Sequence, residues 1–344
     1  MRIAEIAPVW VPVPPPTYGG IEWVVSLLAD GLAGRGHEVT LFAAEGSNST
    51  ARLVSPVDGQ RDLSQMGKDI TDEVVHALPA YQQADQFDLI HDHTGLGTAL
   101  AAARKGAQPP VVHTLHGPWN DASRRFFAAV SPPVRLIAIS EAQAAGNPDL
   151  DYAGVVHNGL DLGAHPYKDT KEDFLLFLGR CNPEKGPELA VEVAKRAGLP
   201  LVMAMKRSER HELEHWEKEV EPRLAGTEEL VLDADHGTKV DLLGRARATL
   251  FPIQWPEPFG LVMIESMACG TPVIAMASGA APEIVADGIT GFLTPDRDAM
   301  VEAVARTPEI NPAACRDRVA ERFSAEAMVT KTERIFERVA AGSA

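Results

Sequence analysis

The chain has 344 residues, of which 45% are hydrophobic, enough to build the cores of roughly two domains of ordinary size. Its 32 Lys and Arg residues face 48 Asp and Glu residues, and the resulting net charge of -16 argues against nonspecific binding to nucleic acid or to anionic lipid. The three cysteines are widely spaced and form no CxxC pair, so neither a disulfide framework nor a cysteine-based zinc site is expected.

The first residues, MRIAEIAPVWVPVPPP, lack the basic start and uninterrupted apolar stretch of a signal peptide. No window reaches the roughly 18 apolar residues of a membrane-spanning helix. There is also no basic amphipathic helix of the kind that binds a membrane surface. We therefore expect a cytoplasmic protein with no strong membrane association.

The first half of the chain alternates between strand-like and helix-like runs. RIAEIA (2–7) predicts a strand, and after a Pro/Gly loop the apolar residues from Ile21 to Leu32 recur at helical spacing. GRGHEVTLFAA predicts the next strand, and DLIHDH, PVVHTLH, RLIAIS and AGVVHN follow with helical runs among them. Nearly continuous apolar strands that alternate with helices indicate a parallel sheet with both faces covered.

A polar stretch without periodicity, residues 162–173, separates this half from a second alternating pattern that starts with FLLFLG. We predict an α/β protein with two Rossmann-like, doubly wound domains, residues 1–165 and 166–323. The C-terminal helix, 324–344, is expected to pack back on the first domain. Ligands of such sheets bind beyond the carboxyl ends of the strands, so two facing domains predict a cleft.

Two such domains also suggest a dinucleotide-binding enzyme, which needs GxGxxG after the first strand. Here PVWVPVPPPTYGG follows that strand. The nearest imitation, GLGTAL (95–100), has Leu where the third small residue belongs. A nicotinamide or flavin enzyme is therefore disfavoured.

The segment EPFGLVMIE (257–265) lies between a predicted strand, 248–253, and a predicted helix. The helix begins around Phe259, Gly260 and Leu261, so its first amides and positive dipole end suit a phosphate, and glycine allows close approach. Glu265, two turns into the helix, is placed to accept both hydroxyls of a ribose, because helical side chains lean toward the N-terminus. The simpler alternative is that Glu257 caps the helix and Glu265 points to solvent.

This segment and the residues directly after it, SMACGTPVIAMASGAAPEIVADGITGFL, resemble the donor-site signature of glycosyltransferase family 4, retaining enzymes of the GT-B fold. YGGIEWVVSLLADGLAGRGHEVTLF resembles the opening loop and helix of that family, and LGRCNPEKG resembles its diphosphate clamp. HTLHG, AISEA and VVHNGLD come in the family's order. The resemblance spans nearly the whole chain and includes glycosyltransferases that decorate natural products, of the avilamycin-biosynthesis type.

The resemblance implies roles for individual residues. Arg180 and Lys185 correspond to the pair that neutralises the donor diphosphate, which suits the negative charge gained by the leaving group. Glu257 corresponds to the residue that contacts the sugar hydroxyls, and Glu265 to the residue on the ribose. On the residues alone, Arg180 and Lys185 would equally fit a solvated surface.

Two features of the first half are given roles by the same resemblance. The Gly19 and Gly20 pair matches the glycines that let backbone amides approach sugar or phosphate, although a plain turn fits two glycines nearly as well. His116, at the end of a strand, matches the histidine that contacts the donor sugar near the reaction centre. A lone histidine there is otherwise more often a structural hydrogen-bonding residue.

DLIHDHTG offers His91, Asp92 and His93 as an apparent metal cluster. In a strand, residues 91 and 93 share one face and residue 92 lies on the other, so one ion does not easily collect all three. GT-B enzymes as a family do not depend on a metal-binding DxD site. No metal and no cofactor are predicted.

The predicted function is transfer of a glycosyl unit from a nucleotide diphosphate sugar to the hydroxyl of a small-molecule or oligosaccharide acceptor, with retention, in natural-product or polysaccharide biosynthesis. An epimerase or hydrolase of the same fold and a noncatalytic sugar-nucleotide-binding protein are the alternatives. Residues 46–80 are loop-rich and are the candidate acceptor wall.

Overall fold

The computed structural model describes residues 1–16, 19–59, 61, 70–95, 97–103, 109–131 and 133–342. Parts of two predicted features, Tyr18 of the first loop and residues 60 and 62–69 of the candidate acceptor wall, lie outside this set. The chain divides into two compact units. Unit 1 comprises Met1–Gly159 and Ala325–Ala344, and unit 2 comprises Leu160–Ser324.

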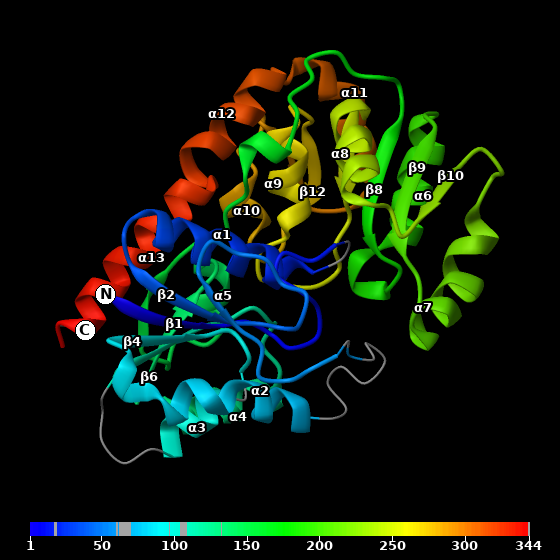
Figure 1. Ribbon diagram of the computed structural model, residues 1–344. Helices are drawn as coiled ribbons and strands as arrows, with labels where there is room; N and C mark the ends of the chain where they lie inside the picture. Colours follow the sequence, from blue (N-terminus) through cyan, green and yellow to red (C-terminus); the bar gives the residue numbers. More distant parts are fainter. Residues whose placement is uncertain are drawn as a thin grey trace. The chain divides into compact units, whose positions relative to one another are not determined.

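Unit 1 is built on a seven-stranded parallel sheet of order β3-β2-β1-β4-β5-β6-β7 (Figure 1). Its strands are β1 (Arg2–Ile6), β2 (Glu38–Phe42), β3 (Arg52–Val54), β4 (Leu89–Asp92), β5 (Val111–Thr114), β6 (Val134–Ala138) and β7 (Tyr152–Val155). Its helices are α1 (Gly20–Gly34), α2 (Thr71–Gln82), α3 (Gly97–Ala103), α4 (Asp121–Val130), α5 (Glu141–Ala145) and α13 (Ala325–Ala340).

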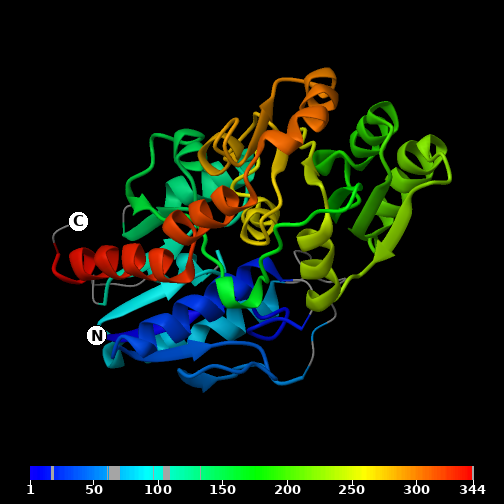
Figure 2. The same ribbon diagram turned by 90° about the horizontal axis from the view of Figure 1, so that it is seen from above.

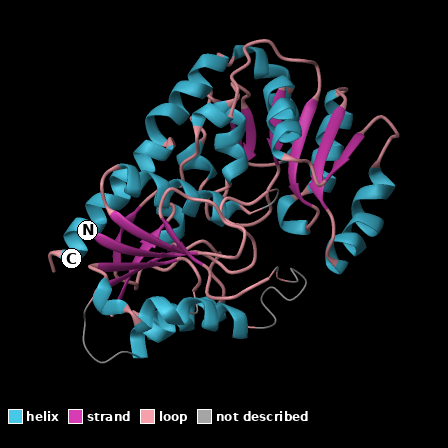
Figure 3. Cartoon of the chain, viewed as in Figure 1, coloured by secondary structure: helices cyan, strands magenta, loops and turns pink. Residues whose placement is uncertain are grey.

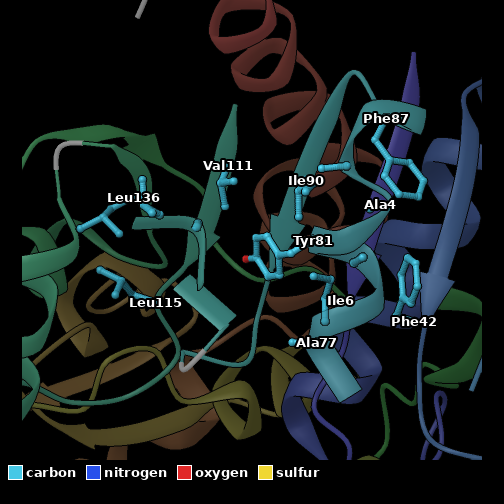
Figure 4. Packing of buried hydrophobic residues seen from close by; sticks show 14 of the residues in the cluster. Ala4, Ile6, Phe42, Ala77, Tyr81, Phe87, Ile90, Val111, Leu115 and Leu136 are labelled. Atoms are coloured by element: carbon cyan, nitrogen blue, oxygen red, sulfur yellow. The ribbon is translucent and has the colours of Figure 1, made fainter. Parts of the chain in front are cut away.

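Alternation along the strands of unit 1 separates an apolar face from a partly polar one. Ala4, Ile6 and Ile90 point into a core that α2 closes with Ala77 and Tyr81 (Figure 4). Glu5, between Ala4 and Ile6, points to the opposite face of the sheet. That face is covered by α1 and α13, which lie side by side (Figures 1 and 2). An ion pair between Arg35 Nη1, just after α1, and Glu333 Oε2 of α13, 2.6 Å apart, joins the two helices.

Unit 2 contains a six-stranded parallel sheet of order β10-β9-β8-β11-β12-β13, with helices around it (Figure 3). Its strands are β8 (Leu175–Arg180), β9 (Leu201–Lys206), β10 (Glu229–Leu232), β11 (Ala248–Phe251), β12 (Val273–Met276) and β13 (Gly291–Thr294). Its helices are α6 (Pro187–Ala197), α7 (Arg210–His215), α8 (His236–Arg245), α9 (Leu261–Ala268), α10 (Ala281–Ile284), α11 (Arg297–Arg306) and α12 (Pro312–Arg322).

The prediction of two doubly wound parallel-sheet domains is confirmed. In each sheet the strand order reverses beside the first strand of the unit, between β1 and β4 in unit 1 and between β8 and β11 in unit 2. At such a reversal, successive helices leave toward opposite faces, and the loops at the carboxyl ends of the two strands leave a crevice between them. The fold therefore marks one ligand-binding position on each sheet.

Candidate functional site

Four of the predicted site residues lie at the end of β8 and in the segments after β8 and β11, the two strands where the order of the unit 2 sheet reverses. β8 and β11 are neighbours, with Phe177 paired to Leu250. Arg180 ends β8 and Lys185 lies in the loop that follows, whereas Glu257 and Gly260 lie in the loop after β11. Residues predicted from two separate motifs are thus carried by the segments that follow two neighbouring strands, where ligands of such sheets bind.

Lys185 and Glu257 are in direct contact. Lys185 Nζ lies 2.5 Å from Glu257 Oε2, and the indole N–H of Trp255 donates to the same oxygen at 2.7 Å. The Lys185 ammonium also lies 5.4 Å from the centroid of the Trp255 ring. The backbone of Glu257 is held by the amide of Ala280, which donates to its carbonyl at 2.9 Å. Glu257 is therefore part of a cation, carboxylate and indole cluster, not a helix cap.

Gly260 sets the start of α9. It adopts φ +85°, which side chains disfavour, and a Cβ there would lie 2.8 Å from both Met263 Cε and Phe251 Cζ. Phe259, just before it, is buried with its ring in edge contact with Phe323. The side chain of Phe259 thus anchors the loop. At the helix start, the backbone groups of Phe259, Gly260 and Leu261 are suited to meet a ligand.

Glu265, one turn further along α9 than Leu261, forms an ion pair that the sequence did not suggest. Its Oε1 lies 2.6 Å from Lys239 Nζ of α8, and both side chains are largely buried. Burial alone would raise the pKa of Glu265, but Lys239, together with His165 and His236, lowers it below its usual value. α8 begins where it does because the Asp235 side chain accepts from the Thr238 amide at 2.7 Å. Glu265 is ionised and held, so the alternative that it points freely to solvent is wrong.

Arg180 is oriented by acids of its own. Its Nε donates to Glu212 Oε1 at 2.6 Å, and its Nη2 also contacts Glu209 Oε1. Glu212 is fully buried, and its other oxygen accepts from the amides of Ser208 and Glu209 at 3.0 Å each. Burial opposes ionisation of Glu212, but these amides and Arg180 outweigh it and lower its pKa. The two predicted clamp cations thus pair with different carboxylates.

The other predicted residues belong to unit 1. Gly19 immediately precedes α1 and Gly20 begins it. Gly19 has φ +154°, which side chains rarely adopt, and a Cβ there would lie 2.8 Å from both Glu22 Oε2 and Pro15 Cβ, so this position favours glycine. Glu22 is buried, and burial raises its pKa to about 7.

His116 follows β5 and is partly buried. Its Nε2 lies 2.8 Å from Nδ1 of His93, which follows β4. Burial and the neighbouring imidazoles of His93, His113 and His91 lower the pKa of His116 well below its usual value. Asp92 points away from this group and accepts from the Tyr81 hydroxyl at 2.6 Å, as expected from strand alternation.

Sequence reasoning therefore missed the partners. Lys239, Glu212 and Glu22 were not singled out, and His93 was considered only as a possible metal ligand. The three cysteines are free and buried. In the part of the chain that the structure describes, no helix is long and apolar enough to cross a membrane.

Two families of known proteins match successive parts of the chain. The family described as "Glycosyltransferase Family 4" matches residues 18–163, and the family described as "Glycosyl transferases group 1" matches residues 164–321. The chain is a family 4-like glycosyltransferase. Each of the two matched regions ends close to the division between the compact units.

This glycosyltransferase is 28% identical over 332 residues to a D-inositol 3-phosphate glycosyltransferase of Mycolicibacterium smegmatis. The alignment covers 81% of this chain and 76% of the relative. It is similar in structure to AviGT4, a glycosyltransferase involved in avilamycin A biosynthesis, with a TM-score of 0.76, 26% identity, and coverage of 99% and 98% of the two chains. Its fold also matches that of Anabaena HepE, solved in complex with UDP-glucose, with a TM-score of 0.72, 18% identity, and coverage of 99% and 100%.

Proposed function

We propose that this glycosyltransferase moves a sugar from a nucleotide diphosphate sugar to an acceptor hydroxyl with retention of configuration. The observation that carries the proposal is the pair of carboxylates near α9. Glu257 precedes the helix beside Lys185, and Glu265 lies within it beside Lys239. The start of α9 between them suits a phosphate, so the three features fit the sugar, the diphosphate and the ribose in order.

In this proposal the diphosphate takes Lys185 as its counter-ion and releases Glu257 to the hydroxyls of the sugar. Arg180 supplies a second cation, because a guanidinium bonds phosphate oxygens with several donors at once. Glu265 accepts from the ribose hydroxyls. The UDP-glucose complex of HepE supports UDP-sugars as the first donors to try.

The transfer breaks the bond between the anomeric carbon and the diphosphate oxygen, and forms a bond to the acceptor oxygen on the same face of the sugar. The acceptor proton passes to the departing phosphate oxygen. The nucleoside diphosphate leaves with the bonding electron pair, and cations and helix amides stabilise the charge that develops on it. Such a reaction needs neither a protein nucleophile nor a metal ion.

The acceptor is proposed by class only. AviGT4 is involved in avilamycin A biosynthesis, and the relative from Mycolicibacterium smegmatis is named a D-inositol 3-phosphate glycosyltransferase. We propose a small polar molecule or an oligosaccharide with a free hydroxyl as the acceptor, in natural-product or polysaccharide biosynthesis.

The test incubates the protein with UDP-glucose, UDP-N-acetylglucosamine or GDP-mannose and a metabolite pool from a bacterial extract. We expect release of a nucleoside diphosphate together with a new glycosylated product in the mass spectrum. NMR of that product should show the anomeric configuration of the donor. If the donor is consumed without any acceptor as fast as in the metabolite pool, the protein is instead an epimerase or hydrolase. If it binds the donor without consuming it, the protein is a sensor.

A further inference from the structure

A chain of buried polar side chains runs through unit 1 to His116. Glu5 Oε1 lies 2.8 Å from His91 Nδ1 and 2.6 Å from His93 Nε2. The far nitrogen of His93, Nδ1, lies 2.8 Å from His116 Nε2, and the far nitrogen of His91, Nε2, lies 2.8 Å from Thr114 Oγ1. The Glu5 carboxylate therefore has two hydrogen-bonded arms, one through His91 to Thr114 and one through His93 to His116, the residue for which the family resemblance implies a sugar contact.

The fold explains how these residues meet. β1 pairs with β4 so that Glu5 lies directly beside His91, and alternation turns both toward the face covered by α13. The ring of His91 packs edge-on against Phe336 of α13, with centroids 4.9 Å apart. Glu5 and His91 have no exposed surface, and His93 is 5% exposed. Because these side chains are buried, the hydrogen bonds between them decide where their protons lie.

The carboxylate fixes the direction of those bonds. Burial would raise the pKa of Glu5, but the two imidazoles lower it to about 2, so Glu5 is ionised at neutral pH. An ionised carboxylate only accepts hydrogen bonds. The nitrogens that face it, His91 Nδ1 and His93 Nε2, must therefore carry protons.

The position of the proton on His93 then determines the position of the proton on His116. Burial and the neighbouring His91 lower the pKa of His93, so that ring is neutral and has a single N–H. With its proton on Nε2, His93 offers Nδ1 as an acceptor, and His116 Nε2 must donate to it. We propose that Glu5 and His93 are positioning residues: they hold His116 with its proton on Nε2 and its Nδ1 ready to accept from a hydroxyl of the nucleotide sugar. This inference rests on the proposed function and on the sugar contact that the family resemblance implies for His116.

A metal ion is the competing occupant, because Glu5, His91 and His93 bring three possible ligand atoms together. Among the described residues, Glu5 Oε2 is buried without a hydrogen-bond partner. Zinc held at about 2.0–2.1 Å in tetrahedral geometry separates its ligand atoms by roughly 3.3 Å. The two nitrogens are 3.2 Å apart, but their separations from Glu5 Oε1 are only 2.6 and 2.8 Å, which are hydrogen-bond lengths. The geometry favours protons over a metal.

The first test uses the wild-type protein with ¹⁵N-labelled histidine and requires no nucleotide. We expect NMR to find the proton of His116 on Nε2 and that of His93 on Nε2, with His116→Gln used to assign the His116 signals. A proton on His93 Nδ1 would overturn the inference. So would added zinc that binds one ion per chain and removes the N–H signals of His91 and His93.

The second test compares Glu5→Gln with Thr114→Val. The amide of Gln both donates and accepts, so it no longer dictates the protons of His93, whereas Thr114→Val removes a bond from the arm that does not reach His116. We expect Glu5→Gln to weaken UDP-glucose binding about three- to tenfold, the value of roughly one hydrogen bond. UDP binding should not change, and Thr114→Val should leave both ligands unaffected.

Equal losses of UDP-glucose affinity in the two variants would refute the positioning role. If Glu5→Gln does not fold, the NMR measurement on the wild-type protein still decides. If the wild-type protein binds UDP but gains nothing from the glucose, the sugar contact of the proposed function fails. The proton positions of His116 and His93 are measured in the protein without nucleotide, so they are tested independently of that result.

Discussion

Glu22 should make the stability of unit 1 fall as the pH rises. Its carboxyl lies in the first turn of α1, where the helix dipole favours the charged form, but burial dominates and raises its pKa from 4.5 to about 7. Between these values the folded state binds a proton that the unfolded state has lost. The stability that the Glu22 carboxyl contributes to the folded state is therefore complete below about pH 4.5. It is lost as the pH rises to about pH 7.

The size of the Glu22 pKa shift sets the size of the stability change. Each pKa unit corresponds to about 1.36 kcal/mol, so burying the ionised carboxylate costs about 3 kcal/mol at pH 8. Glu22→Gln keeps the shape of the protonated acid and cannot ionise. We expect the variant to match the wild-type protein at pH 4 and to be about 3 kcal/mol more stable at pH 8.

The assay is urea denaturation at several pH values, read by pulsed hydrogen exchange of peptides from α1, so that unit 1 is followed separately from unit 2. Other groups of unit 1 also titrate: burial lowers the pKa of His113 to about 4, which makes stability rise with pH. The difference between variant and wild type removes that contribution. Glu337→Gln, at an exposed position of α13, is the matched control. The reasoning would be refuted if the difference in unfolding free energy between Glu22→Gln and the wild-type protein changed as little with pH as the difference for Glu337→Gln.

Four further outcomes are expected at the proposed site. Lys185→Ala should weaken nucleoside diphosphate binding by about 1.5–3 kcal/mol in titration calorimetry, with exposed Lys218→Ala unchanged; equal affinities would remove Lys185 from the diphosphate site. Glu265→Gln should lose more affinity for a ribonucleotide than for its 2′-deoxy analogue, and equal losses would remove the ribose contact. Glu257→Gln should bind nucleoside diphosphate more tightly but nucleotide sugar more weakly, and parallel changes would show that Glu257 does not exchange partners. Transfer should persist after EDTA treatment, whereas loss restored by Mg²⁺ would show a metal requirement.

The fold could be predicted because its signals are local. Strand and helix periods differ, and a polar, aperiodic stretch marks the change between the two patterns. The site loops could be located for the same reason, since Lys185, Glu257 and Gly260 lie in short segments directly after strands. A strand that ends in a parallel sheet delivers its loop to one edge, whatever the details of packing.

The partners could not be predicted because they depend on which elements pack together. Lys239 meets Glu265 only because α8 lies against α9, and the two residues are 26 positions apart. Glu5 meets His91 across 86 positions, through the pairing of β1 with β4. The alternation argument correctly separated Asp92 from His91 and His93. The same argument could not predict that Glu5 joins them, because the pairing of β1 with β4 depends on the order of strands in the complete sheet.

The ion pairs change how the proposed donor site should be understood. Arg180, Lys185 and Lys239 face four carboxylates, Glu209, Glu212, Glu257 and Glu265, so these residues together are not cationic. A diphosphate must therefore compete with a carboxylate for Lys185, and the cost is recovered only when the released Glu257 finds a new partner. Sugar hydroxyls provide that partner, whereas a nucleoside diphosphate does not. On the proposed function, the arrangement couples recognition of the sugar to neutralisation of the phosphate, and it favours release of the nucleoside diphosphate once the sugar has been transferred.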